Sequence, residues 1–431
     1  MGKTQEQALK QAAAKRVKTV TTKRVVITGM GAITPAGMGV EALWNALLDG
    51  ECCISKLPEE FPAHGFSVAG QLRGYDPLEH FTKKETRRMS RFVQMATLAA
   101  DEAFAQAGID MDTEDATRFA CVFGTGIGGI GVCEREVANL LEKGPRKVSP
   151  LFVPMLIGNM AAGDLAIRYG LKGACTDTAT ACATGTHCIG EAYRLLKFGY
   201  ADAALCGGTE ESMSPVGLNG FGNLGALSKA QDPHDASKPF DVNRNGFVPG
   251  EGAGAVVLET LEHAQARGAH IIAEVAGFGS TGDGYHMTAP DPTGDGALRS
   301  MRDALDEAGF EPTDIGHINA HGTATHANDA MEALAINTLC GEAAAHIPVV
   351  SIKGCTGHML GAAGAVEAII TAKSVVEGIV PPTIGFNEPD PECNVCVSNK
   401  TVEAPSQMVA LSNSFGFGGH NATLAICPFV E

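Results

Sequence analysis

A repeated order of strand, glycine pair and helix constrains the fold of this chain more than any other feature. Residues 24–31 (RVVITGMG) are a β-branched run that reaches two glycines, and residues 271–279 (IIAEVAGFG) do the same. After each run, a helical stretch ends at a glycine, Gly108 or Gly309, and a further strand follows. The pattern predicts that both glycine pairs are turns that end their strands. Two halves of similar order predict a duplicated α/β unit with helices covering buried sheets.

The boundaries of the two halves follow from this repeat. We expect an N-terminal half with longer insertions at 24–270 and a C-terminal half at 271–431, without a linker between them. Residues 1–23 are a basic leader without the apolar segment of a secretory signal, and we expect them to be poorly ordered. The longest uncharged stretch, 404–430, is interrupted by polar residues, so no membrane span is expected.

The net charge disfavours some classes of binding partner, and the cysteine content indicates the cellular compartment. A formal net charge of -17 opposes binding to nucleic acid or an anionic membrane surface. The 13 cysteines are an odd number spread thinly over 431 residues, which favours reduced thiols and a cytoplasmic location over a disulfide framework.

Cys182 is the first candidate for chemistry. It lies in TACATG (180–185), where a β-prone run passes into a helical stretch. Near a helix N-terminus, free N–H groups and the helix dipole stabilise a thiolate, so we expect a nucleophile here. For a cysteine taken alone, a small buried thiol among alanines is the commoner role.

Two histidines in the second half favour the catalytic interpretation. His321 follows a strand in NAHGTAT (319–325), and His358 follows a glycine turn in KGCTGH (353–358). Strand ends and helix starts are the positions at which α/β proteins display catalytic groups. A cysteine with two histidines suits thioester chemistry, although either histidine could instead be a hydrogen-bonded core residue.

Three further patterns are weaker signals of function, because each also has a plain structural interpretation or lacks a required residue. NSFGFGGH (413–420) could present N–H groups to an anion, with an aromatic residue at a pocket, or be a plain turn. GTGIGG (124–129) matches GxGxxG but lacks the acidic residue that would contact a ribose. His317, His321 and His326, or Cys393 with Cys396, do not have the spacing of a metal site, so we predict none.

Together these motifs resemble the β-ketoacyl-[acyl carrier protein] synthases, in particular the type II elongating enzymes. The resemblance covers residue 24 to the C-terminus and includes GFVPGEGAG (246–254) and LGAAGAVEA (360–368) besides the motifs above. It implies the duplicated thiolase fold in five layers, α/β/α/β/α, and a homodimer.

The same resemblance implies an activity: extension of an acyl chain by decarboxylative Claisen condensation in fatty acid elongation. Cys182 is expected to take the acyl chain from an acyl carrier protein, and His321 and His358 to assist decarboxylation of the malonyl thioester. Backbone N–H groups of Cys182 and Phe417 are expected to form an oxyanion hole. No cofactor is expected, because 4'-phosphopantetheine is carried by the partner.

The remaining implied residues support the chemistry or bind the substrates. Lys353 and Glu367 resemble a charge pair that orients a histidine, and Asp329 matches a structural acidic residue. The expected substrate contacts are Ile127, Phe221, Thr288, Thr323, Thr325, Phe415 and Phe417. The expected carrier-docking residues, on one face of a helix that also includes Arg91, are Lys84, Arg87 and Arg88.

Departures from the family and rival interpretations bear on the partner rather than on the chemistry. Gly225 stands where relatives often carry a docking arginine, and His326 and Asn328 replace the usual proline and glycine. A ketosynthase of a specialised polyketide or aryl-polyene pathway is the main alternative. A non-catalytic chain-length subunit is disfavoured because such subunits generally lack the nucleophile.

Overall fold

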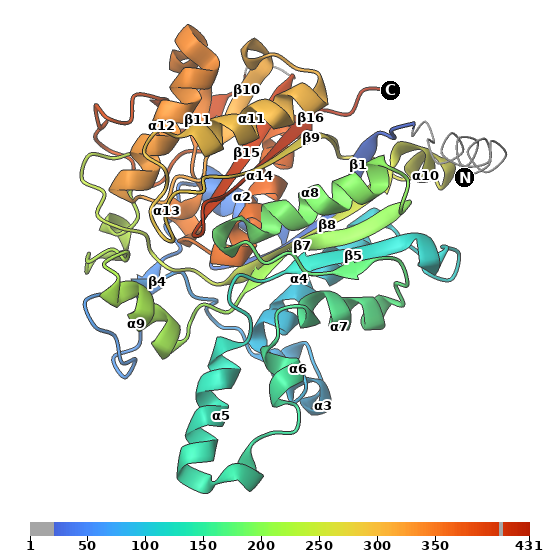
Figure 1. The fold of residues 1–431 in the computed structure, drawn as a ribbon, viewed down its shortest axis with the longest axis vertical. Helices are drawn as coiled ribbons and strands as arrows, with labels where there is room; N and C mark the ends of the chain where they lie inside the picture. The colour runs from blue at the N-terminus through green and yellow to red at the C-terminus, as the bar shows by residue number, and fades with distance from the viewer. Residues whose placement is uncertain (1–20, 405–407) are drawn as a thin grey trace, which may run out of the picture.

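The two halves of the chain build the same arrangement of strands (Figure 1). The computed structural model describes residues 21–404 and 408–431, so most of the expected leader lies outside the described residues. The strands of the first half are, in spatial order, β1 (Val25–Thr34), β8 (Gly252–Thr260), β7 (Ala203–Glu210), β5 (Phe119–Gly124) and β6 (Cys175–Thr176). Those of the second half are β9 (Ala273–Gly282), β16 (His420–Cys427), β15 (Val409–Gly416), β10 (Ile315–Asn319), β11 (Pro348–Val350) and β13 (Cys396–Val397).

The pairing directions also repeat. In each half the first three strands are antiparallel neighbours and the next two pairings are parallel. β1 also pairs with β9 through Val25 and Val275, which joins the two halves edge to edge. The predicted duplication is therefore confirmed.

Helices cover the sheets in five layers. Figure 1 shows them stacked from top to bottom as helices, sheet, helices, sheet and helices. The outer helices of the second half are α11 (Asp295–Ala308) and α12 (His326–Cys340), and those of the first half are α4 (Arg91–Ala107) and α7 (Met160–Tyr169). The middle layer contains α8 (Thr184–Lys197) and α14 (Ala363–Glu377). Alternating apolar residues of the inner strands and these two helices form one buried core, as expected when both faces of a sheet are covered.

The glycine pairs lie inside β1 and β9, so the prediction of turns at these positions is wrong. A Cβ atom on Gly29 would lie 2.1 Å from the carbonyl oxygen of Ala103, and one on Gly277 would lie 2.1 Å from that of Ala304. Without side chains at these positions, α4 and α11 pack directly on the strand backbones. The repeated glycines thus encode close helix–strand packing in both halves.

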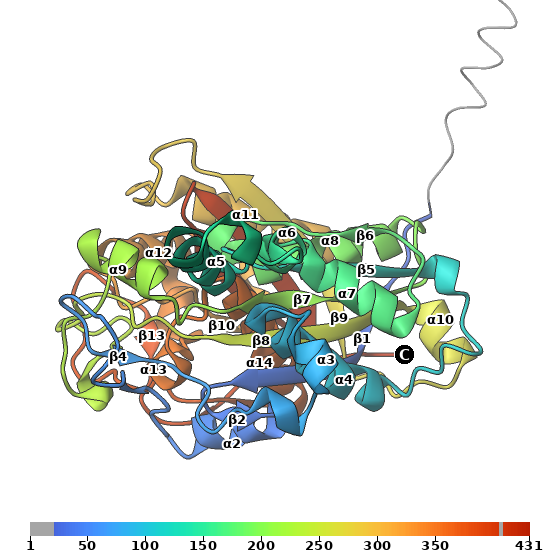
Figure 2. The same cartoon turned by 90° about the horizontal axis from the view of Figure 1, so that it is seen from below.

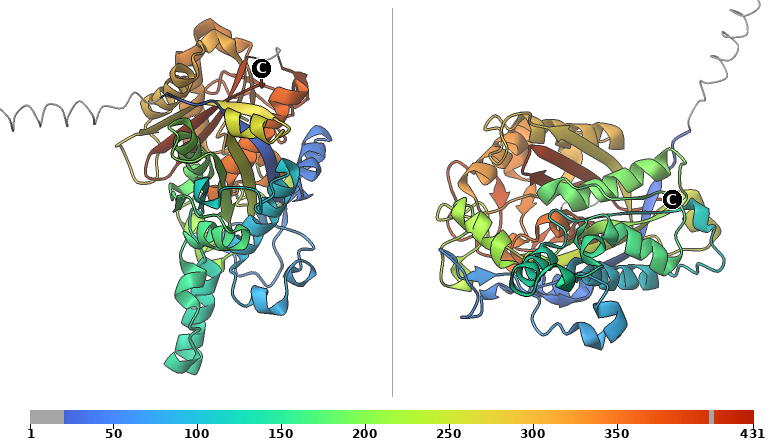
Figure 3. Two further views of the ribbon diagram at one scale, coloured as in Figure 1. Left: turned by 90° about the vertical axis from the view of Figure 1, so that its right-hand side faces the viewer. Right: turned by 60° about the horizontal axis from the view of Figure 1, so that its bottom comes forward.

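Smaller elements complete the fold, and α5 with α6 projects from the body (Figures 1 and 3). The remaining helices are α2 (Val40–Leu48), α3 (Lys83–Thr86), α5 (Ile130–Lys143), α6 (Phe152–Leu156), α9 (Pro215–Asn223), α10 (Leu261–Ala266) and α13 (Lys353–Thr356). The short strands are β2 (Gly37–Met38), β3 (Ser55–Lys56), β4 (Val68–Ala69), β12 (Ile379–Val380) and β14 (Val402–Glu403). The 3-10 turns are η1 (Pro77–Glu79), η2 (Ala116–Arg118), η3 (Pro145–Lys147), η4 (Ala181–Ala183), η5 (Pro233–Asp235), η6 (Pro312–Asp314), η7 (Gly341–Ala345) and η8 (Leu360–Ala362).

The two ends of the strands differ in what covers them. Figure 2 places α9 and α13 at one end and α10 with the C-terminus at the other. The candidate site described next lies at the α9 and α13 end. Among the described helices, none is both long and apolar enough to cross a membrane.

Candidate active site

Cys182 lies in η4, directly before α8, where the sequence predicted it. Ala181 has a φ of 51°, an uncommon value for a residue with a side chain, so the backbone is strained at the residue before Cys182. Two bonds from α8 hold the turn: Thr184 Oγ1 accepts from the N–H of Thr180 at 2.9 Å, and the Thr180 hydroxyl is 2.9 Å from Nδ1 of His187.

The protonation state of Cys182 differs from the prediction. Burial raises the pKa of its thiol to about 12, although the positive charge of Lys353 and a hydrogen bond from the Phe417 N–H lower it. The helix start is present, but loss of water around the sulfur outweighs the groups that favour a thiolate. Cys182 is therefore a thiol in the free protein at neutral pH.

His321 and His358 come from separate turns and meet in one place. His321 follows β10, and its backbone N–H donates to Glu332 Oε1 at 2.8 Å. His358 follows α13, and its backbone N–H donates to the carbonyl of Val248 at 2.6 Å. The two imidazole centroids are 5.2 Å apart, with an angle of 82° between the rings.

Both imidazoles are neutral. Burial holds the pKa of each far below its ordinary value, and the charge of Lys353 acts in the same direction. Their Nδ1 atoms are buried and have no hydrogen-bond partner in the described structure. A neutral imidazole carries one N–H, so each ring can donate a hydrogen bond without carrying a charge.

The predicted pair of Lys353 and Glu367 forms a buried ion pair beside His321. Lys353 Nζ contacts a carboxylate oxygen of Glu367 and donates to the carbonyl oxygen of His321. Burial raises the pKa of Glu367, and Lys353 counteracts this. The pair therefore fixes the backbone of His321 and places a positive charge next to the site.

One cavity of about 370 Å³ brings the predicted residues together. The predicted residues in its lining are Cys182, Phe221, Thr288, His321, Thr323, Thr325, His358, Phe415 and Phe417. The sulfur comes from the first half and both imidazoles from the second, so the site exists only where the halves meet. A thiol beside two neutral imidazoles can accept an acyl group and then stabilise an oxyanion next to it.

The hairpin between β15 and β16 closes one wall of the cavity. Gly416 lies so close to the turn that carries Cys182 that a Cβ atom on Gly416 would be 2.7 Å from the carbonyl oxygen of Thr180 and 3.2 Å from the nitrogen of Cys182. Glycine at 416 thus lets the Phe417 backbone approach Cys182. The ring of Phe417 lies 6.2 Å from that of Phe221 across the cavity.

Family models match both halves of the chain. The family model for the β-ketoacyl synthase N-terminal domain matches residues 22–264, and the model for the C-terminal domain matches residues 272–387. The chain belongs to the β-ketoacyl synthase family. The Cys182, His321 and His358 arrangement is thus found in a chain of the family that its motifs resembled.

Relatives and solved structures cover nearly the whole chain. It is 47% identical over 408 residues to 3-oxoacyl-[acyl-carrier-protein] synthase 2 of Staphylococcus aureus (strain COL), covering 94% of this chain and 99% of the relative. It is 45% identical over 413 residues to the synthase 2 of Vibrio harveyi, covering 95% of this chain and 99% of the relative.

Two solved structures establish the thiolase fold of this β-ketoacyl synthase. A β-ketoacyl synthase from Burkholderia phymatum STM815 is 34% identical, with a TM-score of 0.88, and covers 95% of this chain and 100% of its own. A type II polyketide ketosynthase in complex with its acyl-carrier protein is 32% identical, with a TM-score of 0.88 and the same coverage of both chains.

Some predicted residues of this synthase lie outside the cavity lining. Ile127 is 37% exposed, and its N–H donates to the buried carboxylate of Glu210 at 3.2 Å. The glycine run of 124–129 therefore wraps around a carboxylate and not a nucleotide. Asp329 is buried and accepts hydrogen bonds from the N–H groups of Phe240 and Thr323, which agrees with a structural role.

The single docking helix predicted for residues 84–91 is wrong. A capping box of Thr82 and Glu85 starts α3, which ends at Thr86, and α4 starts at Arg91. Arg91 turns inward, because its guanidinium donates two hydrogen bonds to the buried carboxylate of Glu251. Lys84, Arg87 and Arg88 remain exposed but do not share a helix face with Arg91.

Two residues at the site, Glu210 and Phe247, were not predicted from the sequence. Glu210 has a pKa raised to about 7 by burial and accepts from the N–H groups of Gly126 and Gly361, so it ties the first half to the turn after His358. Phe247 packs its ring edge on His358 at 5.4 Å. Glu210 has no local signal, because its partners lie far away in the sequence. Phe247 lies in the motif GFVPGEGAG (246–254), which could have marked it, but its contact with His358 is made only by folding. Among the described residues, no group of His, Cys, Asp and Glu is arranged to hold a metal ion.

Proposed function

We propose that this chain catalyses decarboxylative Claisen condensation of an acyl group on Cys182 with a malonyl thioester of acyl carrier protein, in fatty acid elongation. The observation that carries the proposal is the single cavity shared by the thiol of Cys182 and the neutral imidazoles of His321 and His358. The products are a 3-oxoacyl thioester of the carrier and carbon dioxide.

The first step transfers the acyl chain to Cys182. The sulfur attacks the carbonyl carbon of the acyl thioester, loses its proton, and expels the carrier thiol, which gains one. Because burial raises the pKa of Cys182 to about 12, the proton leaves as the bond forms and not before. The oxyanion that forms is assigned to the N–H groups of Cys182 and Phe417, and the place of Gly416 beside Cys182 supports this.

The second step breaks the bond between the malonyl carboxylate and its neighbouring carbon. The electron pair of that bond forms an enolate, whose oxygen carries the negative charge. N–H groups of His321 and His358 are assigned to this oxygen, because neutral donors in a buried site stabilise developing charge without being desolvated ions themselves. The enolate carbon then attacks the acyl carbonyl carbon, the bond from that carbon to the Cys182 sulfur breaks, and the departing thiolate takes up a proton from water to restore the thiol.

The substrates reach the site on the phosphopantetheine arm of the carrier, so the chain needs no cofactor of its own. Thr323 and Thr325 line the cavity with their hydroxyls 2.9 Å apart, and Thr288 lies on the same lining. These hydroxyls are suited to the amide groups of the arm. Ile127, next to the nucleophile turn, is assigned to the acyl side on the family resemblance alone.

Exposed Lys84, Arg87 and Arg88 are proposed to dock the acidic carrier. Reversing Arg87 and Arg88 to glutamate is expected to raise the KM for carrier thioesters about tenfold, most strongly at low salt. The same charge change at exposed Arg302 and Lys400 is the control. An unchanged KM in the double variant removes these residues from the docking surface.

A homodimer and a cytoplasmic location complete the proposal. The dimer is supported by β6, a sheet edge whose residues are exposed, and by exposed apolar side chains of α5, of α6 and of the residue after α6: Val137, Leu140, Leu141, Val153 and Ile157. Thirteen free thiols favour a reducing compartment. Light scattering tests the dimer, and a monomer at micromolar concentration contradicts it.

The decisive experiment is incubation with malonyl carrier protein and a panel of acyl carrier proteins, followed by mass analysis of the products. We expect 3-oxoacyl products two carbons longer than the acyl substrate. Relatives named as synthase 2 at 45–47% identity favour saturated acyl chains over the poly-β-keto chains of a polyketide pathway. Repeated extension of unreduced keto intermediates would instead identify a polyketide ketosynthase.

A further inference from the structure

Arg244 is a completely buried cation next to the cavity, outside the chemistry described above. Its side chain has no exposed surface. Its charge is balanced by Asp390, which it contacts directly, and by Asp329 at 3.7 Å. Burying a guanidinium and its partners costs several kcal/mol of desolvation, so such a cluster is a poor device for stability alone.

Two of the hydrogen bonds of the guanidinium go to the loop that carries the two threonines of the cavity. Nε and Nη2 each donate to a backbone carbonyl, those of Thr325 and His326, at 3.3 Å. Nη1 donates to the carbonyl of Asp241 at 2.9 Å. Arg244 therefore joins the loop of 323–326 to the segment of 241–246.

That loop needs to be held. Ala324 has a φ of 65°, in the left-handed region that a residue with a side chain avoids, so this backbone conformation is strained. The N–H of Gly246 donates to the carbonyl of Ala324 at 3.0 Å, and Asp329 accepts from the N–H of Thr323 at 3.0 Å. Arg244 lies between these two attachments and bonds the carbonyls that follow Ala324.

Only an arginine fits this role. Its planar fork directs donors to three carbonyls and a carboxylate at once, whereas the ammonium of a lysine has three donors at one point. The charge could be balanced by either residue, but the geometry of the loop depends on the fork.

We propose that Arg244 is a positioning residue that sets the hydroxyls of Thr323 and Thr325 for the phosphopantetheine arm. The inference rests on the proposed function, because it takes these hydroxyls as contacts of the arm. It assigns to Arg244 an effect on binding of the arm and none on the reactivity of Cys182.

The test compares Arg244→Lys and Arg244→Met with the wild type. The substrates are malonyl carrier protein and malonyl-pantetheine, which has the arm but not the carrier. We expect KM to rise about tenfold or more for both substrates in both variants, with kcat within about threefold, since a displaced hydrogen-bonding loop costs about 1–2 kcal/mol of binding. Arg244→Lys should recover the thermal stability lost in Arg244→Met but not the KM.

Alkylation of Cys182 by iodoacetamide separates positioning from collapse of the site. Its rate should stay within about twofold of wild type in Arg244→Lys, because the reagent does not use the arm. Asp390→Asn leaves the bonds from Arg244 to Thr325 and His326 in place and should raise KM less than the two arginine variants do. If both arginine variants fail to fold, the KM of Asp390→Asn is the measurement used. Exposed Arg302→Met is the matched control.

Two results would overturn the inference. One is an unchanged KM in a folded Arg244→Lys protein. The other is a parallel fall in kcat, alkylation rate and thermal stability, which marks a merely structural role. Failure of the proposed function looks different, since the wild type itself would then form no 3-oxoacyl product.

Discussion

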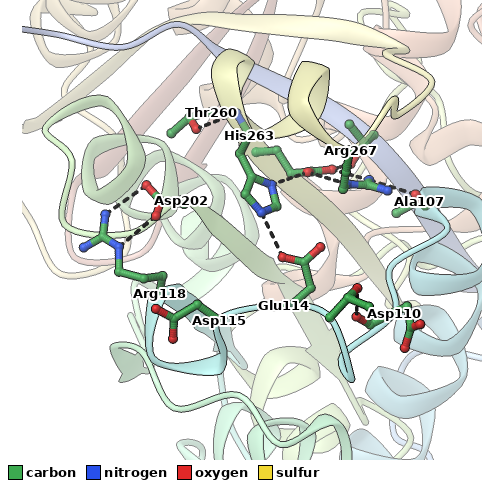
Figure 4. Close-up of polar contacts among 12 residues, drawn as sticks. Ala107, Asp110, Glu114, Asp115, Arg118, Asp202, Thr260, His263 and Arg267 are labelled. Carbon is green, nitrogen blue, oxygen red and sulfur yellow. Dashed lines mark hydrogen bonds and ion pairs between the residues drawn. The ribbon is translucent and has the colours of Figure 1, made fainter.

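Buried polar side chains cluster near both ends of strand β8, but the two clusters differ in whether their polar atoms have hydrogen-bond partners. At the α10 end, Glu259 accepts hydrogen bonds from Thr28, His263 and Arg267, and the second ring nitrogen of His263 is 2.9 Å from Glu114 (Figure 4). In this cluster both carboxylate oxygens of Glu259 and both ring nitrogens of His263 have partners. At the other end, the cavity leaves Nδ1 of His321 and His358 without one in the described structure.

The pKa values follow from this difference. Hydrogen bonding to Glu259 raises the pKa of His263, while burial lowers those of His321 and His358. Burial alone would raise the pKa of Glu259, but bonds from Arg267, His263 and Thr28 bring it down to about 2. Paired groups stay charged and hold elements together, whereas unpaired groups stay neutral and free to bind substrate. The two unpaired imidazoles that line the cavity thus distinguish this end of the sheet from the paired cluster at the other end.

The largest expected effect is that of Cys182→Ala. We expect condensation to fall by at least about ten thousand-fold, because no residue replaces the nucleophile. Intact-protein mass spectrometry after incubation with acyl carrier protein should show no acyl adduct. The control is Cys188→Ala, which removes a buried thiol of the following helix, α8, that lies outside the cavity lining. An acyl adduct on the Cys182→Ala protein would refute the assignment.

His321→Ala and His358→Ala should each lower condensation about a hundred- to ten thousand-fold while acyl transfer to Cys182 persists. Each removes one donor from the enolate but leaves the oxyanion hole of the first step. Carbon dioxide release from malonyl carrier protein measures the loss. His317→Ala, which removes a buried histidine of β10 outside the cavity lining, is the control. Normal decarboxylation in either cavity variant would contradict its role.

Lys353→Met should destabilise the protein by about 3–5 kcal/mol, because it leaves Glu367 as a buried unpaired carboxylate. The double variant Lys353→Met/Glu367→Leu should recover most of the melting temperature, since apolar residues fill the same space. Condensation should stay impaired in both, because the bond from Lys353 to the His321 carbonyl is missing. Full activity in the double variant would show that this ion pair only stabilises the fold, like the cluster at the other end.

The smallest expected effect is that of His263→Gln, about 1 kcal/mol. Because folding raises the pKa of His263, its charged form contributes fully below the unfolded value of about 6.5. This contribution is lost as pH rises through the folded value. The melting temperatures of wild type and variant should therefore differ most near pH 6 and converge toward pH 9. Exposed His270→Gln is the matched control, and a gap between wild type and His263→Gln that widens with pH would contradict the pairing.

Local patterns predicted more of the catalytic set than of its support. Cys182, His321 and His358 each lie at a strand or helix boundary with a glycine nearby, and such boundaries are visible in sequence. Arg244 and Glu210 carry no local pattern. Apart from the carbonyl of Asp241, which bonds Arg244, the partners that hold them in the site lie 81 to 151 residues away, so only folding brings them together.

The two wrong predictions about local structure, the helix of 84–91 and the turns at the glycine pairs, have a common cause. The spacing of the basic residues suggested one helix for 84–91, but Arg91 points inward because it forms an ion pair with the buried carboxylate of Glu251. The glycine pairs suggested turns, but close packing of α4 and α11 keeps them in strands. In both cases a tertiary contact overrode the local pattern.

The amino-acid sequence by itself determined the duplicated α/β order, the three residues at the centre of the site and the family, because each depends on local periodicity or on a short motif. The tertiary structure decided the protonation state of those residues and the identity of the groups that hold them. Both depend on desolvation and on distances between remote segments, and these quantities exist only once the two halves have closed around the cavity.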